Sequence, residues 1–227
     1  MIKCLCPNCG INLLHSHQLD DLEVRPARNK SRIIHPSCSS CGYFIRLSTI
    51  SSNIRPDNKV LLITGTGGSG KSSLGQLIES KADYIFLDGD SVSRRESHYA
   101  RLNPEITQKP RDSMGLCTAE TINTMMVLCA LGYNVVVGYL ILNSGVLAMY
   151  EASLAKCGIK PIFRVLIPKL GVCVERDINR ECWTAGEQWV NQPYDEICSF
   201  LISHPTNCLD TSAETLEETF TRHFKHL

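Results

Sequence analysis

An apolar run that leads into a glycine-rich loop constrains this chain more than any other feature. Residues 60–64 read VLLIT, as in a buried strand, and residues 65–72 read GTGGSGKS. The loop has the form G-x-x-x-x-G-K-S/T, in which glycines let backbone N–H groups converge on phosphate oxygens and the lysine reaches the terminal phosphates. The helix expected over 72–81 directs its N-terminal partial positive charge at the same anion. The sequence therefore predicts a nucleotide site, with Ser72 able to ligate Mg²⁺, made by Gly65, Thr66, Gly67, Gly68, Ser69, Gly70, Lys71, Ser72 and Ser73.

The segments after this loop alternate between strand-like and helix-like patterns. The expected strands cover 84–88, 133–142, 162–167 and 207–210, and the expected helices cover 114–131, 145–157, 170–183, 194–202 and 213–224. Such alternation predicts a mainly parallel sheet with helices on both faces. We therefore expect an α/β fold, a three-layer sandwich whose ligands bind at the carboxyl ends of the strands.

The first 42 residues carry a second pattern, two C-x2-C-G units about thirty residues apart. Each unit presents two thiolates at the spacing of a tetrahedral zinc site, and the following glycine permits a tight turn around the metal. Four thiolates leave no position for water, so the expected Zn²⁺ is structural. The predicted ligands are Cys6, Cys9, Cys38 and Cys41. Cys4 could replace Cys6, and further candidates are His15, His17 and His35.

This N-terminal pattern resembles a zinc ribbon, with residues 42–50 as one of its short strands. We expect a zinc-ribbon domain over 1–52, a polar linker over 53–59 and an α/β domain over 60–227. The whole chain has 23 basic and 23 acidic residues, but residues 1–60 carry eight basic against four acidic, a net charge of +4. A nucleic-acid partner, if there is one, is therefore expected at the ribbon, although zinc ribbons also bind proteins or nothing.

No membrane or secretory segment is visible in the sequence. It has no run of 18 or more apolar residues and no basic start followed by an apolar stretch. We expect a soluble, cytoplasmic protein without a membrane partner. The cysteines after residue 41 lie singly among apolar residues, as reduced core cysteines do.

Residues 60–227 resemble the small-molecule kinases of the phosphate-loop (P-loop) NTPase class, which includes gluconate kinase, adenylylsulfate kinase, shikimate kinase and chloramphenicol phosphotransferase. Three segments carry the resemblance: the loop over 65–72, FLDGDS over 86–91, and ERDINR over 175–180, which looks like the arginine-bearing lid of these enzymes. The resemblance implies a P-loop sandwich, ATP and Mg²⁺ as cofactors, and phosphoryl transfer to a hydroxyl group of a small molecule.

The resemblance also suggests roles for four residues besides Lys71. Asp90 would accept or orient the proton of the acceptor hydroxyl and Asp88 would hold a water bound to Mg²⁺, although the two could exchange roles. Arg176 and Arg180 are four apart and so share a helix face. One of them would contact the phosphates and the other would lie near the adenine, while pairing with neighbouring acidic residues is the alternative for each. Residues 183–187 are expected to form a lid loop hinged at Gly186.

One departure from P-loop ATPases follows the strand expected over 133–142. Gly138 and Tyr139 stand where many of these ATPases have an aspartate that organises magnesium. Its absence argues against a motor or switch ATPase. It also weakens the match to chloramphenicol phosphotransferase, and it leaves Asp88 and Asp90 as the acidic residues beside the metal.

The acceptor should bind to the basic segment over 91–111, which contains Arg94, Arg95 and Arg111. Arginine presents a planar fork to carboxylates, sulfates and phosphates, so we expect an anionic acceptor, unless the segment is a solvated loop with incidental charge. Two other functions stay open. One is a polynucleotide 5'-hydroxyl kinase that holds nucleic acid with the zinc ribbon, and the other is a non-catalytic, nucleotide-regulated protein whose ribbon recruits a partner.

Overall fold

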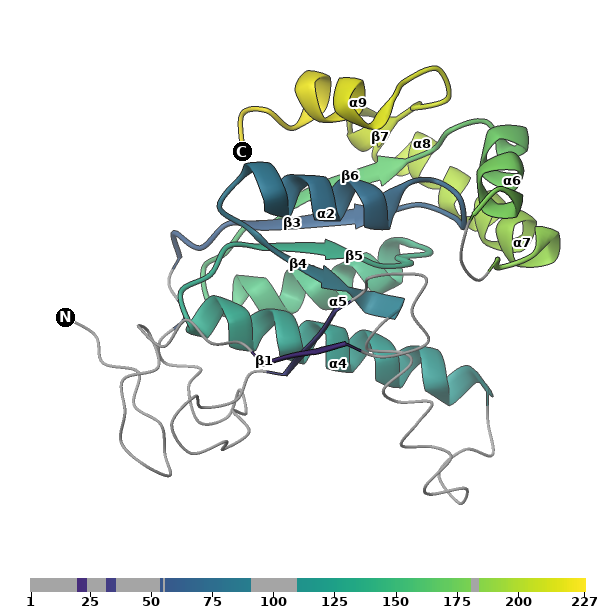
Figure 1. Cartoon of the computed structure of the whole chain (residues 1–227). Helices are drawn as coiled ribbons and strands as arrows, with labels where there is room; N and C mark the ends of the chain where they lie inside the picture. The colour runs from purple at the N-terminus through teal and green to yellow at the C-terminus, as the bar shows by residue number, and fades with distance from the viewer. Residues whose placement is uncertain (1–19, 24–31, 36–53, 55, 91–109, 181–183) are drawn as a thin grey trace.

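The structure is a computed structural model that describes residues 20–23, 32–35, 54, 56–90, 110–180 and 184–227 (Figure 1). The strands are β1 Asp20–Glu23, β2 Arg32–His35, β3 Val60–Thr64, β4 Ile85–Asp88, β5 Val135–Gly138, β6 Ile162–Leu166 and β7 Cys208–Leu209. The α-helices are α2 Lys71–Lys81, α4 Pro110–Ala130, α5 Ser144–Ala155, α6 Leu170–Ile178, α7 Glu187–Cys198, α8 Phe200–Ser203 and α9 Leu216–His223. A short 3₁₀ turn, η4 Pro205–Asn207, precedes β7.

Within the described residues, β3 to β7 form a five-stranded sheet in the order β4-β5-β3-β6-β7. Each of its pairings is parallel; Leu62 of β3, for example, is in register with Val137 and Phe163. The carboxyl ends of all five strands therefore meet at one edge of the sheet, with the end of β3 at its centre. The expected α/β fold with a mainly parallel sheet is confirmed.

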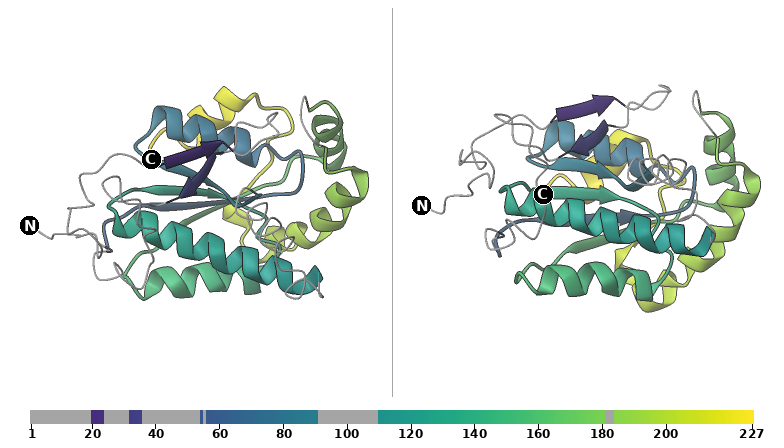
Figure 2. Two further views of the ribbon diagram at one scale, coloured as in Figure 1. Left: turned by 60° about the horizontal axis from the view of Figure 1, so that its bottom comes forward. Right: turned by 90° about the horizontal axis from the view of Figure 1, so that it is seen from below.

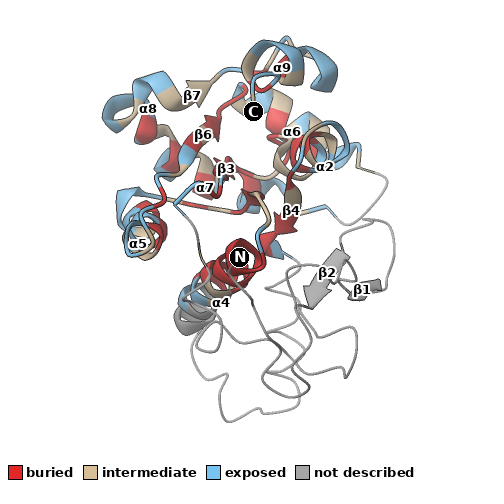
Figure 3. Cartoon of the chain, turned by 90° about the vertical axis from the view of Figure 1, so that its left-hand side faces the viewer, coloured by how far each residue is buried: buried red, intermediate tan, exposed pale blue. Residues whose placement is uncertain are grey.

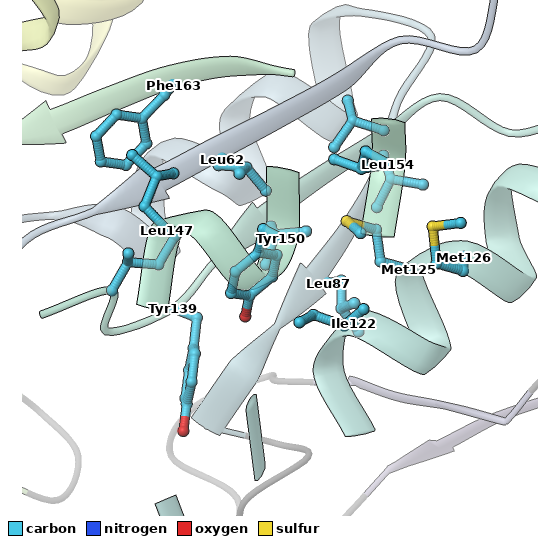
Figure 4. Close-up of a cluster of buried hydrophobic side chains, with 14 of the residues drawn as sticks. Leu62, Leu87, Ile122, Met125, Met126, Tyr139, Leu147, Tyr150, Leu154 and Phe163 are labelled. Carbon is cyan, nitrogen blue, oxygen red and sulfur yellow. The ribbon is translucent and has the colours of Figure 1, made fainter. Parts of the chain in front are cut away.

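The residues of β3 alternate between two hydrophobic clusters, one on each face of the sheet. Val60 and Leu62 pack with α4 and α5, whereas Leu61 and Ile63 pack with α2 and with two aromatic residues, Phe220 of α9 and Phe224 just after it. Figure 2 shows the sheet between these two helix pairs, and Figure 3 shows that β3 and β4 are mostly buried, whereas the edge strand β7 is half-buried. Figure 4 shows the cluster on the α4 and α5 side, where Met125 and Tyr150 are fully buried. The three-layer arrangement is thus confirmed.

The last third of the chain differs most from the sequence expectation. The helix expected over 170–183 ends at Ile178, and the one expected over 194–202 instead begins at Glu187 and continues through Pro193. Proline lacks an N–H and usually disfavours a helix interior. Here Val190, Pro193 and Ile197 are all buried on one face of α7. Packing of that face outweighs the lost hydrogen bond.

The chain leaves the sheet earlier after β5 than expected. The strand expected over 133–142 is paired only over Val135–Gly138. Beyond it, the Thr64 hydroxyl donates to the carbonyl of Ile141 (3.1 Å), and its oxygen accepts from the N–H of Ile141 (2.8 Å). These bonds hold the segment that contains Tyr139 at the carboxyl edge of the sheet.

The N-terminal predictions are covered only in part. Strands β1 and β2 pair antiparallel, with Asp20 opposite His35. The predicted zinc ligands Cys6, Cys9, Cys38 and Cys41, and the strand expected over 42–50, lie outside the described residues. The domain boundary at 53–59 stays a prediction.

The described part of the chain contains no clustered metal ligands, no membrane-spanning helix and no disulfide. It contains no group of three or more His, Cys, Asp or Glu side chains that could hold a metal ion. None of its helices combines the length and the apolar character needed to cross a membrane. The cysteines that it covers after residue 41 form no disulfide, as expected, and they are Cys117, Cys129, Cys157, Cys173, Cys198 and Cys208.

Candidate active site

The loop between β3 and α2 forms a cradle at the centre of the carboxyl edge. Gly68 and Gly70 have φ values of +72° and +96°, which favour glycine. The helix α2 has no side-chain cap at its N-terminus, and the space beside the Cα of Gly70 is open. The buried hydroxyl of Ser69 has no hydrogen-bond partner among the described residues. Uncapped N–H groups and open space make this helix end a suitable site for an anion.

Lys71 is the first residue of α2 and lies over this loop. Its Nζ donates to the carbonyl oxygens of Gly65 (2.7 Å) and Thr66 (2.8 Å). Burial lowers the pKa of Lys71; Asp90 and, less strongly, Asp88 oppose the shift, while Arg180 adds to it. Lys71 follows β3, and Asp88 and Asp90 lie at the end of β4, so these three residues lie at the same carboxyl edge of the parallel sheet. Arg180 lies beside the loop as well, because it pairs with Asp177, whose Oδ1 lies 3.8 Å from the position of a Cβ on Gly67. We refer to Lys71, Asp88, Asp90 and Arg180 as one cluster.

The two aspartates at the carboxyl end of β4 have different environments. Asp88 is 4% exposed, and its Oδ1 accepts a hydrogen bond from the backbone N–H of Asp90 (3.0 Å). Asp90 is exposed. Between them, a Cβ on Gly89 would lie 2.0 Å from Cδ2 of Tyr139, so only glycine fits there. The carboxylate of Asp88 thus holds the backbone of Asp90 in place, and the ring of Tyr139 packs against Gly89 between the two aspartates.

The two arginines of α6 and its C-terminal extension point to different places. Nη2 of Arg176 donates to the carbonyl oxygens of Thr211 (3.1 Å) and Glu214 (3.5 Å), between β7 and α9. Arg180 instead pairs with Asp177 (3.3 Å), whose Oδ1 lies 3.8 Å from the position of a Cβ on Gly67 in the phosphate loop. Arg180 is therefore the arginine on the side of the phosphate loop. The expectation of one shared face does not describe how these two side chains lie.

Helices α6 and α7 pack directly on the phosphate loop. The hydroxyl of Thr66 donates to the carbonyl of Val190 in α7 (2.6 Å), and both residues are buried. A Cβ on Gly68 would lie 2.0 Å from the carbonyl oxygen of Cys173 in α6. Figure 1 shows the two helices side by side at this edge of the sheet. Helices α6 and α7 and the phosphate loop thus form one packed unit.

Gly68→Ala is expected to lower the free energy of unfolding by about 2–4 kcal/mol, because the new methyl group meets a backbone carbonyl and the positive φ is strained for alanine. Urea unfolding measures the effect. The matched control is Gly171→Ala in α6, where a Cβ meets nothing within 4 Å and where alanine is the better helix former. An unfolding free energy for Gly68→Ala equal to that of the wild type would contradict this description of the loop.

Alkaline pH is expected to weaken nucleotide binding through Lys71. Because the pKa of Lys71 is lowered from 10.5, its ammonium loses its proton at a lower pH than an ordinary lysine, and a neutral amine attracts phosphates less. As the pH rises, the affinity for ATP should therefore begin to decrease at a pH lower than 10.5, the usual pKa of a lysine. Calorimetric titrations across pH 7–10 measure the decline, and Lys71→Met should show a flatter profile. Equal slopes for the two proteins would rule out Lys71 as the titrating group.

The other predicted site residues are covered unevenly. Ser72 is half-buried and Ser73 exposed in the first turn of α2. Gly186, the expected hinge, precedes α7 with a φ of +87°. The predicted acceptor residues Arg94 and Arg95 lie outside the described residues, as does the side chain of Arg111. The anion-binding prediction for that segment therefore stays a prediction.

A groove of about 540 Å³ runs along α7 and is lined by Glu187, Gln188, Asn191, Gln192 and Asp195. At helical spacing these residues lie on a different face from Val190, which contacts the phosphate loop. We do not assign this groove to the nucleotide, because the helix N-terminus and Lys71 are the groups that suit phosphates.

Sequence reasoning missed one residue of the site and one contact. Asp177 is 1% exposed although aspartate is rarely buried, and Thr66, itself a predicted site residue, also links the loop to α7. The spacing of four between Cys173 and Asp177 was an available signal, since it places both on the buried face of α6. Nothing local indicated the partner of Thr66, because Val190 lies 124 residues away.

Comparison with known proteins identifies the fold. No protein-family model matches the chain, and no curated protein matches its sequence. A gluconokinase from Sinorhizobium meliloti 1021 superposes with a TM-score of 0.51 at 20% identity, over 72% of this chain and 87% of that one. The tunicamycin resistance protein of Deinococcus radiodurans gives 0.50 at 14% identity, over 73% and 92%. A chain of the Pnkp1/Rnl/Hen1 RNA repair complex gives 0.50 at 14% identity, over 64% and 46%.

These identities are low, so the likeness concerns the fold. The described α/β part of the chain has the fold of P-loop kinases such as gluconokinase, as the resemblance of residues 60–227 implied.

Proposed function

We propose that this chain is an ATP-dependent kinase that transfers the terminal phosphate of ATP to a hydroxyl group of a small molecule. The observation that carries the proposal is the cluster of Lys71, Asp88, Asp90 and Arg180 at an uncapped helix N-terminus. Phosphoryl transfer requires positive charge around the transferred group and an oriented hydroxyl, and it requires little else from a protein. Lys71 and Arg180 supply the positive charge, and Asp90 supplies a carboxylate that can orient the acceptor hydroxyl.

The residues of the cluster have separate roles in this proposal. Lys71 exchanges its two carbonyl partners for phosphate oxygens, and Arg180 neutralises the charge of the transferred group. Asp90, the exposed aspartate, accepts the proton of the acceptor hydroxyl. Arg176 lies beside Thr211, whose buried hydroxyl has no hydrogen-bond partner among the described residues, and we assign this place to the adenine.

Ser72, in the first turn of α2, and Asp88, the last residue of β4, supply oxygen atoms, the ligands that Mg²⁺ prefers. They would hold the metal directly or through water. Bound Mg²⁺ neutralises charge that develops on the phosphate oxygens. Because Gly138 and Tyr139 replace the aspartate of many P-loop ATPases, Asp88 is the acidic residue left for this task.

We further propose an anionic acceptor, held by Arg94, Arg95 and Arg111. The support is the charge of the segment over 91–111, which follows Asp90 directly in the sequence. A second candidate acceptor is the 5'-hydroxyl group of a polynucleotide. It is favoured by the likeness to a chain of an RNA repair complex and by the net charge of +4 over residues 1–60.

ADP release by the full chain with Mg²⁺ tests the proposal against a set of acceptors. The set comprises acidic sugars, neutral sugars, nucleosides, adenylylsulfate, antibiotics and 5'-hydroxyl oligonucleotides. We expect one acidic class to stimulate ADP release. Stimulation by oligonucleotides, falling steeply with salt, would favour the polynucleotide kinase. Nucleotide binding with no stimulated release, equal in wild type and Asp90→Asn, would favour the non-catalytic, nucleotide-regulated protein.

We also propose that Cys6, Cys9, Cys38 and Cys41 hold one structural Zn²⁺. The support is the spacing of the two C-x2-C-G units. Elemental analysis of the purified chain should find about one zinc per chain, lost in Cys9→Ser and retained in Cys208→Ser, which changes a cysteine of the α/β domain. Zinc in equal amounts in both variants would contradict this ligand set.

A further inference from the structure

One buried carboxylate beside the phosphate loop has no role in the proposal above. Asp177 lies in α6, is 1% exposed, and is directed toward Gly67, because its Oδ1 lies 3.8 Å from the position of a Cβ on that glycine. A negative charge beside a phosphate site repels phosphate, and burial of an unpaired charge costs free energy. The role of this carboxylate must therefore come from the groups that it contacts.

The two carboxylate oxygens of Asp177 contact different residues that follow α6. Oδ2 accepts a hydrogen bond from the backbone N–H of Gly186, the residue before α7 (3.0 Å). Oδ1 lies 3.3 Å from Nη1 of Arg180 and has no hydrogen-bond partner among the described residues. One carboxylate thus joins the start of α7 to the guanidinium of Arg180.

The surroundings make this link specific to Arg180. Arg176, one residue before Asp177, is directed to Thr211 and Glu214 instead. Arg180 keeps 31% of its side chain exposed, so without the carboxylate it is free to turn into solvent. Oδ1 of Asp177 lies 3.3 Å from Nη1 of Arg180 and 3.8 Å from the position of a Cβ on Gly67, so the guanidinium lies beside the phosphate loop.

We propose that Asp177 is a positioning residue that holds Arg180 toward the terminal phosphate of ATP and fastens α7 over the phosphate loop at the same time. The inference rests on the proposed function. Asp177 does not touch the nucleotide; it acts through Arg180. The Thr66 bond to Val190 holds α7 to the loop four residues after Gly186. The position of the guanidinium and the start of α7 are linked because both contact the carboxylate of Asp177.

The test compares the wild type, Asp177→Asn, Arg180→Ala and the double variant, in full-length protein with Mg²⁺. An asparagine oxygen still accepts from Gly186, so Asp177→Asn removes mainly the charge that pairs with Arg180. The matched control is Glu175→Gln, which neutralises an exposed carboxylate on the same helix. Calorimetry measures the dissociation constants of ATP and ADP, and their ratio reports the contact with the terminal phosphate without any need for an acceptor.

We expect Arg180→Ala and Asp177→Asn each to reduce the preference for ATP over ADP by about tenfold, and the double variant to reduce it no further. Glu175→Gln should match the wild type. A merely structural Asp177 would weaken both nucleotides alike and add to the effect of Arg180→Ala.

Three results overturn the inference: an unchanged ratio in Asp177→Asn, equal loss of both nucleotides, or tighter ATP binding, which would mean that Asp177 withdraws Arg180 from the phosphate. A wild type that prefers ATP but phosphorylates no acceptor would contradict the proposed function alone, since the ratio still tests Asp177. A wild type that binds neither nucleotide overturns both.

Discussion

Asp90→Asn is expected to lower kcat for the stimulated acceptor by about a thousandfold while the dissociation constant of ATP stays within about twofold. Asparagine has the size of aspartate but cannot accept a proton, and Asp90 is exposed beside the loop rather than part of it. The turn survives, because its backbone N–H still donates to Asp88. Steady-state kinetics and calorimetry measure the two quantities.

Two further variants separate the roles of the aspartates. Asp83→Asn, an exposed site at the other end of β4, should leave kcat unchanged. Asp88→Asn should raise the Mg²⁺ concentration needed for half-maximal rate, as expected for a residue beside the metal. If Asp88→Asn abolished turnover and Asp90→Asn did not, the roles of the two would have to be exchanged.

Lys71→Met is expected to lower kcat/KM for ATP by about a thousandfold with little change in stability. Methionine fills a similar volume without the charge, so the free energy of unfolding should stay within about 1 kcal/mol of the wild type. Lys71 loses two carbonyl contacts, but burial already disfavours its charged form, as its lowered pKa indicates. Kinetics and urea unfolding measure both effects.

The control for Lys71→Met is Lys81→Met at the other end of α2. Lys81 is exposed and pairs with Glu217, and exposed pairs contribute little. Lys81→Met should therefore bind ATP as the wild type does. Wild-type ATP affinity in Lys71→Met would refute the loop as a phosphate site.

The sheet could be predicted from the sequence because its strands and helices are visible in short stretches of neighbouring residues. The apolar run VLLIT indicates a buried strand, and the spacing of apolar residues after the loop indicates a helix. The alternation of such strands and helices then predicts parallel pairing. Helix α7 was placed late because Pro193 reads locally as a breaker, whereas its buried face reflects packing against distant residues.

The positions of site residues could be predicted where the spacing within a short sequence motif determines how its residues lie. The loop glycines and Lys71 lie as the spacing implied, and the Asp88-Gly89-Asp90 turn ends its strand at the same edge. The divergence of Arg176 and Arg180 was not predictable, since it depends on Thr211 and on a carboxylate that local sequence favours at the surface.

Transfer of the labelled terminal phosphate of ATP into the small molecules of a cell extract tests the central claim most directly, because it requires no guess about the acceptor. We predict one labelled small molecule, formed by the wild type with Mg²⁺ and not by Asp90→Asn. Label that appears only as inorganic phosphate, at equal rates in both proteins, would contradict the account of this chain as a kinase.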